Sequence, residues 1–313
     1  MRVVVLGSAA GGGLPPWSCA CPSCEAQRRE GGRAKPRSQD SLAVSADGQR
    51  WFLLNVSPDV MRQIEWNTAL QPAIAAAGGE RGMRSGTGPI AGAVLTNADL
   101  EHSIGLLSLQ QWAPFGLYAT RATYAGLVVQ NAVFRAPSQQ RSQVLYRELE
   151  LDAFVPLRDV AGRRSGLSVC AFPVLGQVPS HMQAFIEPSD ETNVGLTIRD
   201  DLTGTRVVYV PGAGSADGIA ERSRDASCLF FDGTCWSDEE LGVTEPPRPR
   251  ALAHLPVSGP AGSLRLLGKL PVPRRFYTHV NDTNPMLREG SAERRAVEAQ
   301  GWNVAEDGLE LYV

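Results

Sequence analysis

The chain has 313 residues, with 30 basic and 33 acidic side chains and a formal net charge of −3. Proteins that bind nucleic acid or an anionic membrane surface need a strongly positive field, so this charge balance argues against both classes. A hydrophobic share of 43% and a charged share of 20% are ordinary for a folded protein and exclude disordered, collagen-like and coiled-coil chains. No membrane span is expected, because no run of eighteen apolar residues is present.

Strand and helix signals occur along the whole chain. Residues 3–6 form a β-branched run, and the turn at Asp47-Gly48 predicts a hairpin between residues 41–45 and 51–55. Ser57-Pro58-Asp59 has the cap and first-turn residues of a helix that would extend to Leu70. The remaining predicted elements are strands at 91–96, 117–119, 168–172, 194–198, 207–210, 229–231 and 275–277, helices at 104–111, 121–133 and 291–300, a surface loop at 78–89, and an edge hairpin over 302–313.

This order of elements lacks a regular strand–helix–strand rhythm. It predicts a single layered α/β domain over residues 1–313, built on mixed sheets.

Three of the six cysteines, Cys19, Cys21 and Cys24, lie within six residues of one another. The N-terminal apolar run is too short for a secretion signal, so we expect a cytoplasmic protein in which clustered thiols bind metal rather than form disulfides. Three thiolates can bind one tetrahedral zinc ion together with a fourth ligand from elsewhere in the chain. The alternative is three unrelated small buried residues, which is the interpretation we give to the scattered Cys170, Cys228 and Cys235.

Two polar turns follow predicted strands. The first contains Asn97, Asp99, Glu101 and His102, and the second begins at His279. Carboxylates and histidines at such turns are typical metal ligands. Each turn also has a simpler explanation, because acidic residues cap helices and a histidine at a strand end often only forms hydrogen bonds.

These motifs together resemble the pyrroloquinoline quinone (PQQ) biosynthesis protein B (PqqB) family over nearly the whole chain. The resemblance rests on the Cys-x-Cys-x-x-Cys loop, the turn at 96–105 and the sequence at 279–287, in the same order. It implies the metallo-β-lactamase fold, a four-layer αββα sandwich of two mixed sheets. It also implies a role in making PQQ from a precursor peptide that contains Glu and Tyr.

The resemblance also suggests ligands, residue by residue. Hydrolases of this fold bind two metals through an H-x-H-x-D-H motif, whose four ligand positions are here Asn97, Asp99, Glu101 and His102. The first metal site therefore loses its leading histidines. The second keeps Glu101, His102 and His279, which is the two-histidine, one-carboxylate ligand set of non-haem Fe(II) oxygenases.

Another ligand position of the related hydrolases is also changed in this chain. Pro211-Gly212 stand where a bridging Asp is expected, which argues against hydrolysis between two metals. For the cysteine-bound zinc, the resemblance favours Asp282 as the fourth ligand, with His279 as the competing candidate.

The function that we favour on this basis is iron- and oxygen-dependent hydroxylation of the precursor tyrosine. Asp99 would be an alternative ligand or a base, Asp232 would orient a ligand histidine, and His254 would contact substrate or carry protons. The peptide is expected in a cleft formed by residues 11–16 and the turn after His279. His181 is expected to be an ordinary surface residue or one that only supports a ligand residue.

Two other classes of function stay open. One is a non-catalytic carrier of PQQ or its precursor towards the periplasm, and the other is a metal-dependent hydrolase. No nucleic-acid partner is expected. The sequence does not set the oligomeric state, and a homodimer is compatible with it.

Overall fold

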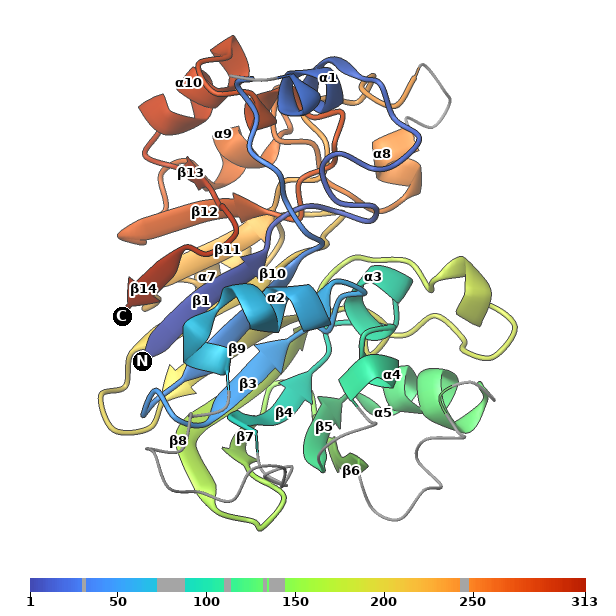
Figure 1. Ribbon diagram of the computed structural model, residues 1–313, viewed down its shortest axis with the longest axis vertical. Helices are drawn as coiled ribbons and strands as arrows, with labels where there is room; N and C mark the ends of the chain where they lie inside the picture. The colour runs from blue at the N-terminus through green and yellow to red at the C-terminus, as the bar shows by residue number, and fades with distance from the viewer. Residues whose placement is uncertain (30–31, 72–87, 110–113, 132–133, 135–143, 243–247) are drawn as a thin grey trace, which may run out of the picture.

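The computed structural model describes residues 1–29, 32–71, 88–109, 114–131, 134, 144–242 and 248–313. Most of the loop predicted at 78–89, and the ends of the helices predicted at 104–111 and 121–133, lie outside these residues. Within the described residues the chain forms two sheets with helices on their outer faces (Figure 1). No helix in this part of the chain has the length and apolar character needed to cross a membrane.

Each sheet has seven strands within the described part of the chain. The first sheet has the spatial order β14 (Glu310–Tyr312), β1 (Arg2–Gly7), β2 (Ser41–Ser45), β3 (Trp51–Leu54), β4 (Ile90–Val94), β5 (Phe115–Ala119) and β6 (Val144–Glu148). The second has the order β13 (Asn303–Val304), β12 (Arg274–Thr278), β11 (Cys228–Asp232), β10 (Arg206–Val210), β9 (Val194–Asp200), β8 (Arg164–Pro173) and β7 (Phe154–Arg158). Both sheets are mixed, because each contains antiparallel and parallel pairs.

The helices are short. The α-helices are α1 (Pro22–Arg28), α2 (Val60–Trp66), α3 (Leu100–Ser103), α4 (Leu106–Leu109), α5 (Arg121–Tyr124), α7 (Ile219–Arg222), α8 (Arg248–Ala251), α9 (Ser263–Leu267) and α10 (Ala292–Ala299). A π-helical turn at Ala125–Val129 continues α5, and 3₁₀ turns occur at Thr68–Leu70, Ser180–Met182 and Pro285–Leu287.

The alternation of side chains along the strands explains the layers. Successive residues of a strand point to opposite faces of its sheet. In β1, Val3 and Val5 pack between the two sheets, whereas Val4 and Leu6 pack beneath the helices on the outer face of the first sheet. In β11, Phe230 points between the sheets, and its neighbours pack against the outer layer that contains α9 and α10. The predicted four-layer αββα sandwich of mixed sheets is therefore confirmed.

The C-terminal hairpin predicted over 302–313 is wrong. β13 pairs with β12 in the second sheet, whereas β14 crosses to the first sheet and pairs with β1. The Asp307 side chain accepts hydrogen bonds from Ser8 and Ser38, which fixes the crossover at the Asp307-Gly308 turn. The two chain ends consequently lie side by side, with the Met1 ammonium 2.8 Å from the Val313 carbonyl oxygen (Figure 1). Strands β6 and β7 were not predicted from the sequence.

The polar turns lie at one edge of the sandwich. The turn containing Asn97 and His102 follows β4, Asp232 ends β11, and His279 follows β12. Because β3–β6 and β10–β13 run parallel within their sheets, these strands deliver their C-terminal ends to the same edge. This arrangement brings residues that are far apart in sequence into one site.

Candidate metal centres

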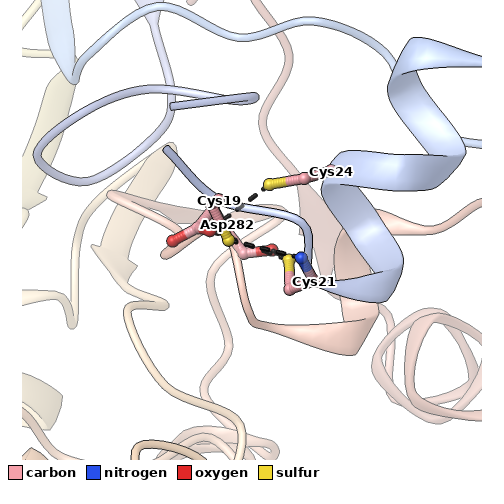
Figure 2. Close-up of side chains that lie close together, drawn as sticks. All are labelled: Cys19, Cys21, Cys24 and Asp282. Atoms are coloured by element: carbon pink, nitrogen blue, oxygen red, sulfur yellow. Dashed lines mark hydrogen bonds between the residues drawn. The ribbon is translucent and has the colours of Figure 1, made fainter. Parts of the chain in front are cut away.

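The four side chains of the cysteine cluster converge from the two ends of the chain (Figure 2). Cys19 and Cys21 lie in the N-terminal loop, Cys24 lies in α1, and Asp282 lies in the turn after His279. Their potential ligand atoms all lie within 4.8 Å of one another. The Cys24 Sγ lies 3.3 Å from Asp282 Oδ2, and the Cys21 Sγ lies 3.3 Å from the Asp282 carbonyl oxygen.

The chemistry of this cluster suits a soft divalent ion. All six cysteines of the chain are free, so these thiols are not consumed in disulfides. Burial and the neighbouring thiols and Asp282 raise the pKa of Cys24, and a hydrogen bond with Asp282 followed by burial raises the pKa of Cys19. Without a cation, Cys19 and Cys24 therefore keep their protons. A metal would replace those protons and join the N-terminal loop to the turn at Asp282.

A second centre surrounds a cavity of about 290 Å³. Glu101, His102 and His279, the predicted iron ligands, line it together with Asp99 and His254. The rings of His102 and His279 lie 5.1 Å apart in an edge-to-face arrangement, and the His279 Nε2 lies 3.9 Å from Glu101 Oε1. The His254 ring stacks on His279 at 5.5 Å. The structure thus places these five side chains, which the resemblance suggested, around one cavity.

In two imidazoles of this cavity, one ring nitrogen has a hydrogen-bond partner and the other has none among the described residues. The His102 Nδ1 lies 2.7 Å from Asn97 Oδ1, and the His279 Nδ1 lies 2.8 Å from Thr234 Oγ1. The Nε2 atoms of both rings are buried and have no hydrogen-bond partner among the described residues. Buried polar atoms without partners are rare in folded proteins, so the two Nε2 atoms in this cavity are candidates to bind a cation. The His279 Nε2 is the one that lies near the Glu101 carboxylate.

Burial keeps both imidazoles neutral. It lowers the pKa of His102 to about 3, and burial together with the neighbouring His102 and His254 lowers the pKa of His279 to about 3. A neutral imidazole has a lone pair on the nitrogen that carries no proton, which is the form that binds metal ions. Burial, followed by the nearby Glu101, raises the pKa of Asp99 to about 7.

Asp232, His254 and His279 also lie close enough to form a metal-binding group. We assign Asp232 to orientation instead, because both of its carboxylate oxygens are already saturated. Its Oδ2 accepts hydrogen bonds from the His254 ring and the Ala213 amide, and its Oδ1 accepts from the amide and the hydroxyl of Thr234. Burial alone would lower the pKa of His254, but the carboxylates of Asp232, Asp99 and Glu101 together outweigh it and raise that pKa.

Other residues suggested by the sequence lie outside this cavity. His181 lies in the 3₁₀ turn at Ser180–Met182, and it is Ser180, not His181, that lines the cavity. The cavity lining includes residues 176–180 and 252–254 but none of residues 11–16, which were expected to form the cleft. Gly12–Pro15 line a different cavity of about 670 Å³. Gly11 does reach the site, since a Cβ on it would lie 3.3 Å from Glu101 Oε1.

Two side chains of this centre were missed. Thr234 holds the Nδ1 side of His279, and Asn193 contacts Asn97. Thr234 could have been found, because its hydroxyl comes two residues after Asp232 at the end of a strand. Nothing in the local sequence marks Asn193, which lies 96 residues from its partner.

Comparison with known proteins agrees with this geometry. The model for the beta-lactamase superfamily domain matches residues 50–280. The coenzyme PQQ synthesis protein B of Methylobacterium sp. (strain 4-46) is 41% identical over 319 residues, covering 99% of both chains. The protein of the same name from Rhizobium meliloti (strain 1021) is also 41% identical, covering 99% of this chain and 97% of its own.

Solved structures agree as well. The crystal structure of Zn(2+)-bound PqqB from Methylobacterium extorquens has a TM-score of 0.86 and 38% identity, and both chains are covered completely. A diphosphatase of the PhnP family has a TM-score of 0.66 at 18% identity, covering 100% of this chain and 97% of its own, which shows a common fold only. The chain therefore belongs to the coenzyme PQQ synthesis protein B family and has the metallo-β-lactamase fold.

Proposed function

We propose that this protein acts in PQQ biosynthesis as an Fe(II)- and oxygen-dependent enzyme that hydroxylates a tyrosine ring. The substrate would be the precursor peptide containing Glu and Tyr, or an intermediate made from it. The family's name supports the pathway. The observation that carries the chemistry is the pair of buried, unpartnered Nε2 atoms of His102 and His279 in a cavity that Glu101 also lines.

Two histidines and one carboxylate fit Fe(II) and leave positions open for oxygen and substrate. Bound Fe(II) would supply the activation of molecular oxygen. The hydrolase alternative has less support, because a two-metal hydrolase needs a bridging carboxylate and Pro211-Gly212 occupy that place. The carrier alternative leaves the two orphaned Nε2 atoms unexplained.

The chain's own residues would manage the protons. His254 lines the cavity while its Nδ1 donates to Asp232, so its other ring nitrogen is left for the substrate. Its raised pKa suits a group that exchanges a proton with the tyrosine hydroxyl near neutral pH. Asp99 lines the same cavity and would serve as a second base.

The cysteine cluster would hold a structural zinc. Three thiolates and one carboxylate make a closed four-ligand set, which is typical of zinc sites that stabilise a fold. The zinc-bound relative from Methylobacterium extorquens supports zinc in this family. The ion would fix the N-terminal loop, including Gly11, against the Glu101 side of the cavity.

The test of this function is oxygen uptake by protein isolated without oxygen and then given Fe(II), a Glu- and Tyr-containing peptide and a two-electron reductant. Hydroxylation inserts one oxygen atom into the ring and reduces the other to water, so the reductant is required. We expect uptake only with Fe(II), and a peptide mass that rises in steps of one oxygen atom. Full activity of iron-free, zinc-only protein, or equal activity without oxygen, would contradict the proposal.

We predict that His254→Ala and His181→Ala have unequal effects on this activity. Loss of a proton-transfer group typically lowers turnover by about 10²–10⁴-fold, and we expect this for His254. His181 does not line the cavity, so its replacement should change turnover little. Turnover of the two variants, with bound iron measured alongside, gives the comparison. Equal losses in both would show that His254 has no special role.

A further inference from the structure

Asn97 stands where the resemblance places a metal-binding histidine of related hydrolases. Its side chain instead forms hydrogen bonds with neighbouring residues. It is 4% exposed, and each of its polar atoms has a partner. The Oδ1 accepts from the His102 ring and from the Asp99 amide, while the Nδ2 donates to Asp99 Oδ2 at 2.7 Å and to Asn193 Oδ1 at 3.0 Å. Neither polar atom of the Asn97 side chain is therefore free to bind an ion.

The direction of these hydrogen bonds is fixed at both ends by the backbone. The amide of Asp99 can only donate, so the atom of Asn97 that faces it is the oxygen. The carbonyl oxygen of Gly212 can only accept, so the Asn193 atom at 3.1 Å from it is the Nδ2. Asn193 therefore presents its own oxygen to Asn97. The side-chain amides of Asn193 and Asn97 thus form a hydrogen-bonded chain, the relay, in which each amide can take only one orientation.

This orientation determines the tautomer of His102. Because the Asn97 oxygen can only accept, the His102 Nδ1 must carry the proton, and the lone pair must lie on Nε2. The Nε2 is the atom that is buried in the cavity without a partner. In many metalloproteins a carboxylate or backbone carbonyl orients a ligand histidine in this way. Here a neutral side-chain amide does so.

The hydrogen-bond partners around residue 97 explain why an amide, and not a carboxylate, occupies this position. A carboxylate at residue 97 could still accept from His102 and from the Asp99 amide, but it could not donate to Asp99 or Asn193. It would also place a negative charge 2.7 Å from the Asp99 carboxylate. By contrast, the other two histidines are held by a carboxylate. The His254 ring hydrogen-bonds directly to Asp232, and the His279 ring is linked to Asp232 through the Thr234 hydroxyl.

We propose that Asn97 and Asn193 are positioning residues that hold His102 in the Nδ1-protonated tautomer and so aim its Nε2 lone pair at the metal. The tautomer follows from the relay alone, whereas its purpose rests on the proposed metal at His102. Asn193 itself depends on a close approach of the backbone, because a Cβ on Gly176 would lie 2.1 Å from its Nδ2.

The test is ¹⁵N NMR of the histidine rings in metal-free protein, which reports the tautomer without metal, oxygen or peptide. Wild-type protein should show His102 as the Nδ1-protonated form. Asn97→Ala should lose this preference, and Asn97→Asp should keep it because the acceptor is retained. Asn67→Ala removes a buried amide whose Nδ2 donates to the Gln63 carbonyl oxygen, and it serves as the matched control. An Nε2-protonated His102 in wild-type protein would overturn the proposal, whether or not the variants fold.

The second readout is the affinity of the histidine site for Co(II), with the cysteine cluster filled by zinc. Asn97→Ala should bind about 10- to 100-fold more weakly, as is usual when an outer partner of a ligand histidine is lost. Asn193→Ala should change the affinity in the same direction, and Asn67→Ala should not. Unchanged affinity in Asn97→Ala would overturn the positioning role. If no metal binds even wild-type protein at this site while His102 shows the expected tautomer, the proposed function fails and the relay stands.

Discussion

Replacing His102 by alanine is expected to abolish Fe(II) binding and oxygen uptake while leaving the zinc content unchanged. The variant loses one of the two buried, unpartnered Nε2 atoms in the cavity. Loss of an outer partner alone costs about 10- to 100-fold in metal affinity, so loss of a ligand should cost more than about 100-fold. Metal analysis of protein purified without oxygen and an oxygen electrode give the two readouts.

His181→Ala is the matched control for His102→Ala, because it removes an imidazole that does not line the cavity. It should keep both iron and zinc. If His102→Ala retains its iron, the ion is bound elsewhere and the ligand set that we propose is wrong. If it loses zinc instead, the zinc belongs to the histidine cavity and not to the cysteines.

Replacing Cys21 by serine is expected to remove about one equivalent of zinc and to lower the melting temperature. The cluster joins residues that are 261 positions apart in sequence, so the ion closes a long loop and should stabilise the fold. A loss of about 2 kcal/mol would correspond to a fall of roughly 3 °C in a chain of this size. Zinc analysis and thermal denaturation measure the two effects.

Cys170→Ser controls for the loss of a thiol, since Cys170 lies in β8 and outside the cluster. It should keep its zinc. Unchanged zinc in Cys21→Ser would refute the assignment of the cluster. Zinc that disappears in His279→Ala but not in Asp282→Ala would identify His279 as the fourth ligand, and the proposed iron site would then lose one of its ligands.

Local sequence patterns predicted most of the sandwich because buried strands leave a clear signal. Runs such as residues 3–6 and 229–231 are apolar at every position, since both of their faces are covered. β6 and β7 were missed because they lie at the edges of their sheets, and most of their residues are only partly buried. The C-terminal hairpin was predicted wrongly because alternation shows that a segment is a strand without showing which sheet it joins.

The residues of the candidate sites also differ in whether a local sequence pattern marks them. Cys19, Cys21 and Cys24 stand out by their spacing alone. Asp282 and His279 were suggested by resemblance, since a single turn far along the chain contains no internal evidence of what it faces. The relay from Asn193 to Asn97 could not be predicted, because it depends on two loops that meet only when the two sheets pack together.

The most direct test of the central claim is the source of the oxygen that enters the peptide. The Fe(II)-loaded protein would be incubated with the Glu- and Tyr-containing peptide, reductant and ¹⁸O₂ in ordinary water, and the product analysed by mass spectrometry. We predict that an intact peptide gains ¹⁸O on the tyrosine ring. A cleaved peptide carrying only oxygen from water would identify a hydrolase, an unmodified peptide that stays bound would identify a carrier, and either result would contradict the oxygenase that we propose.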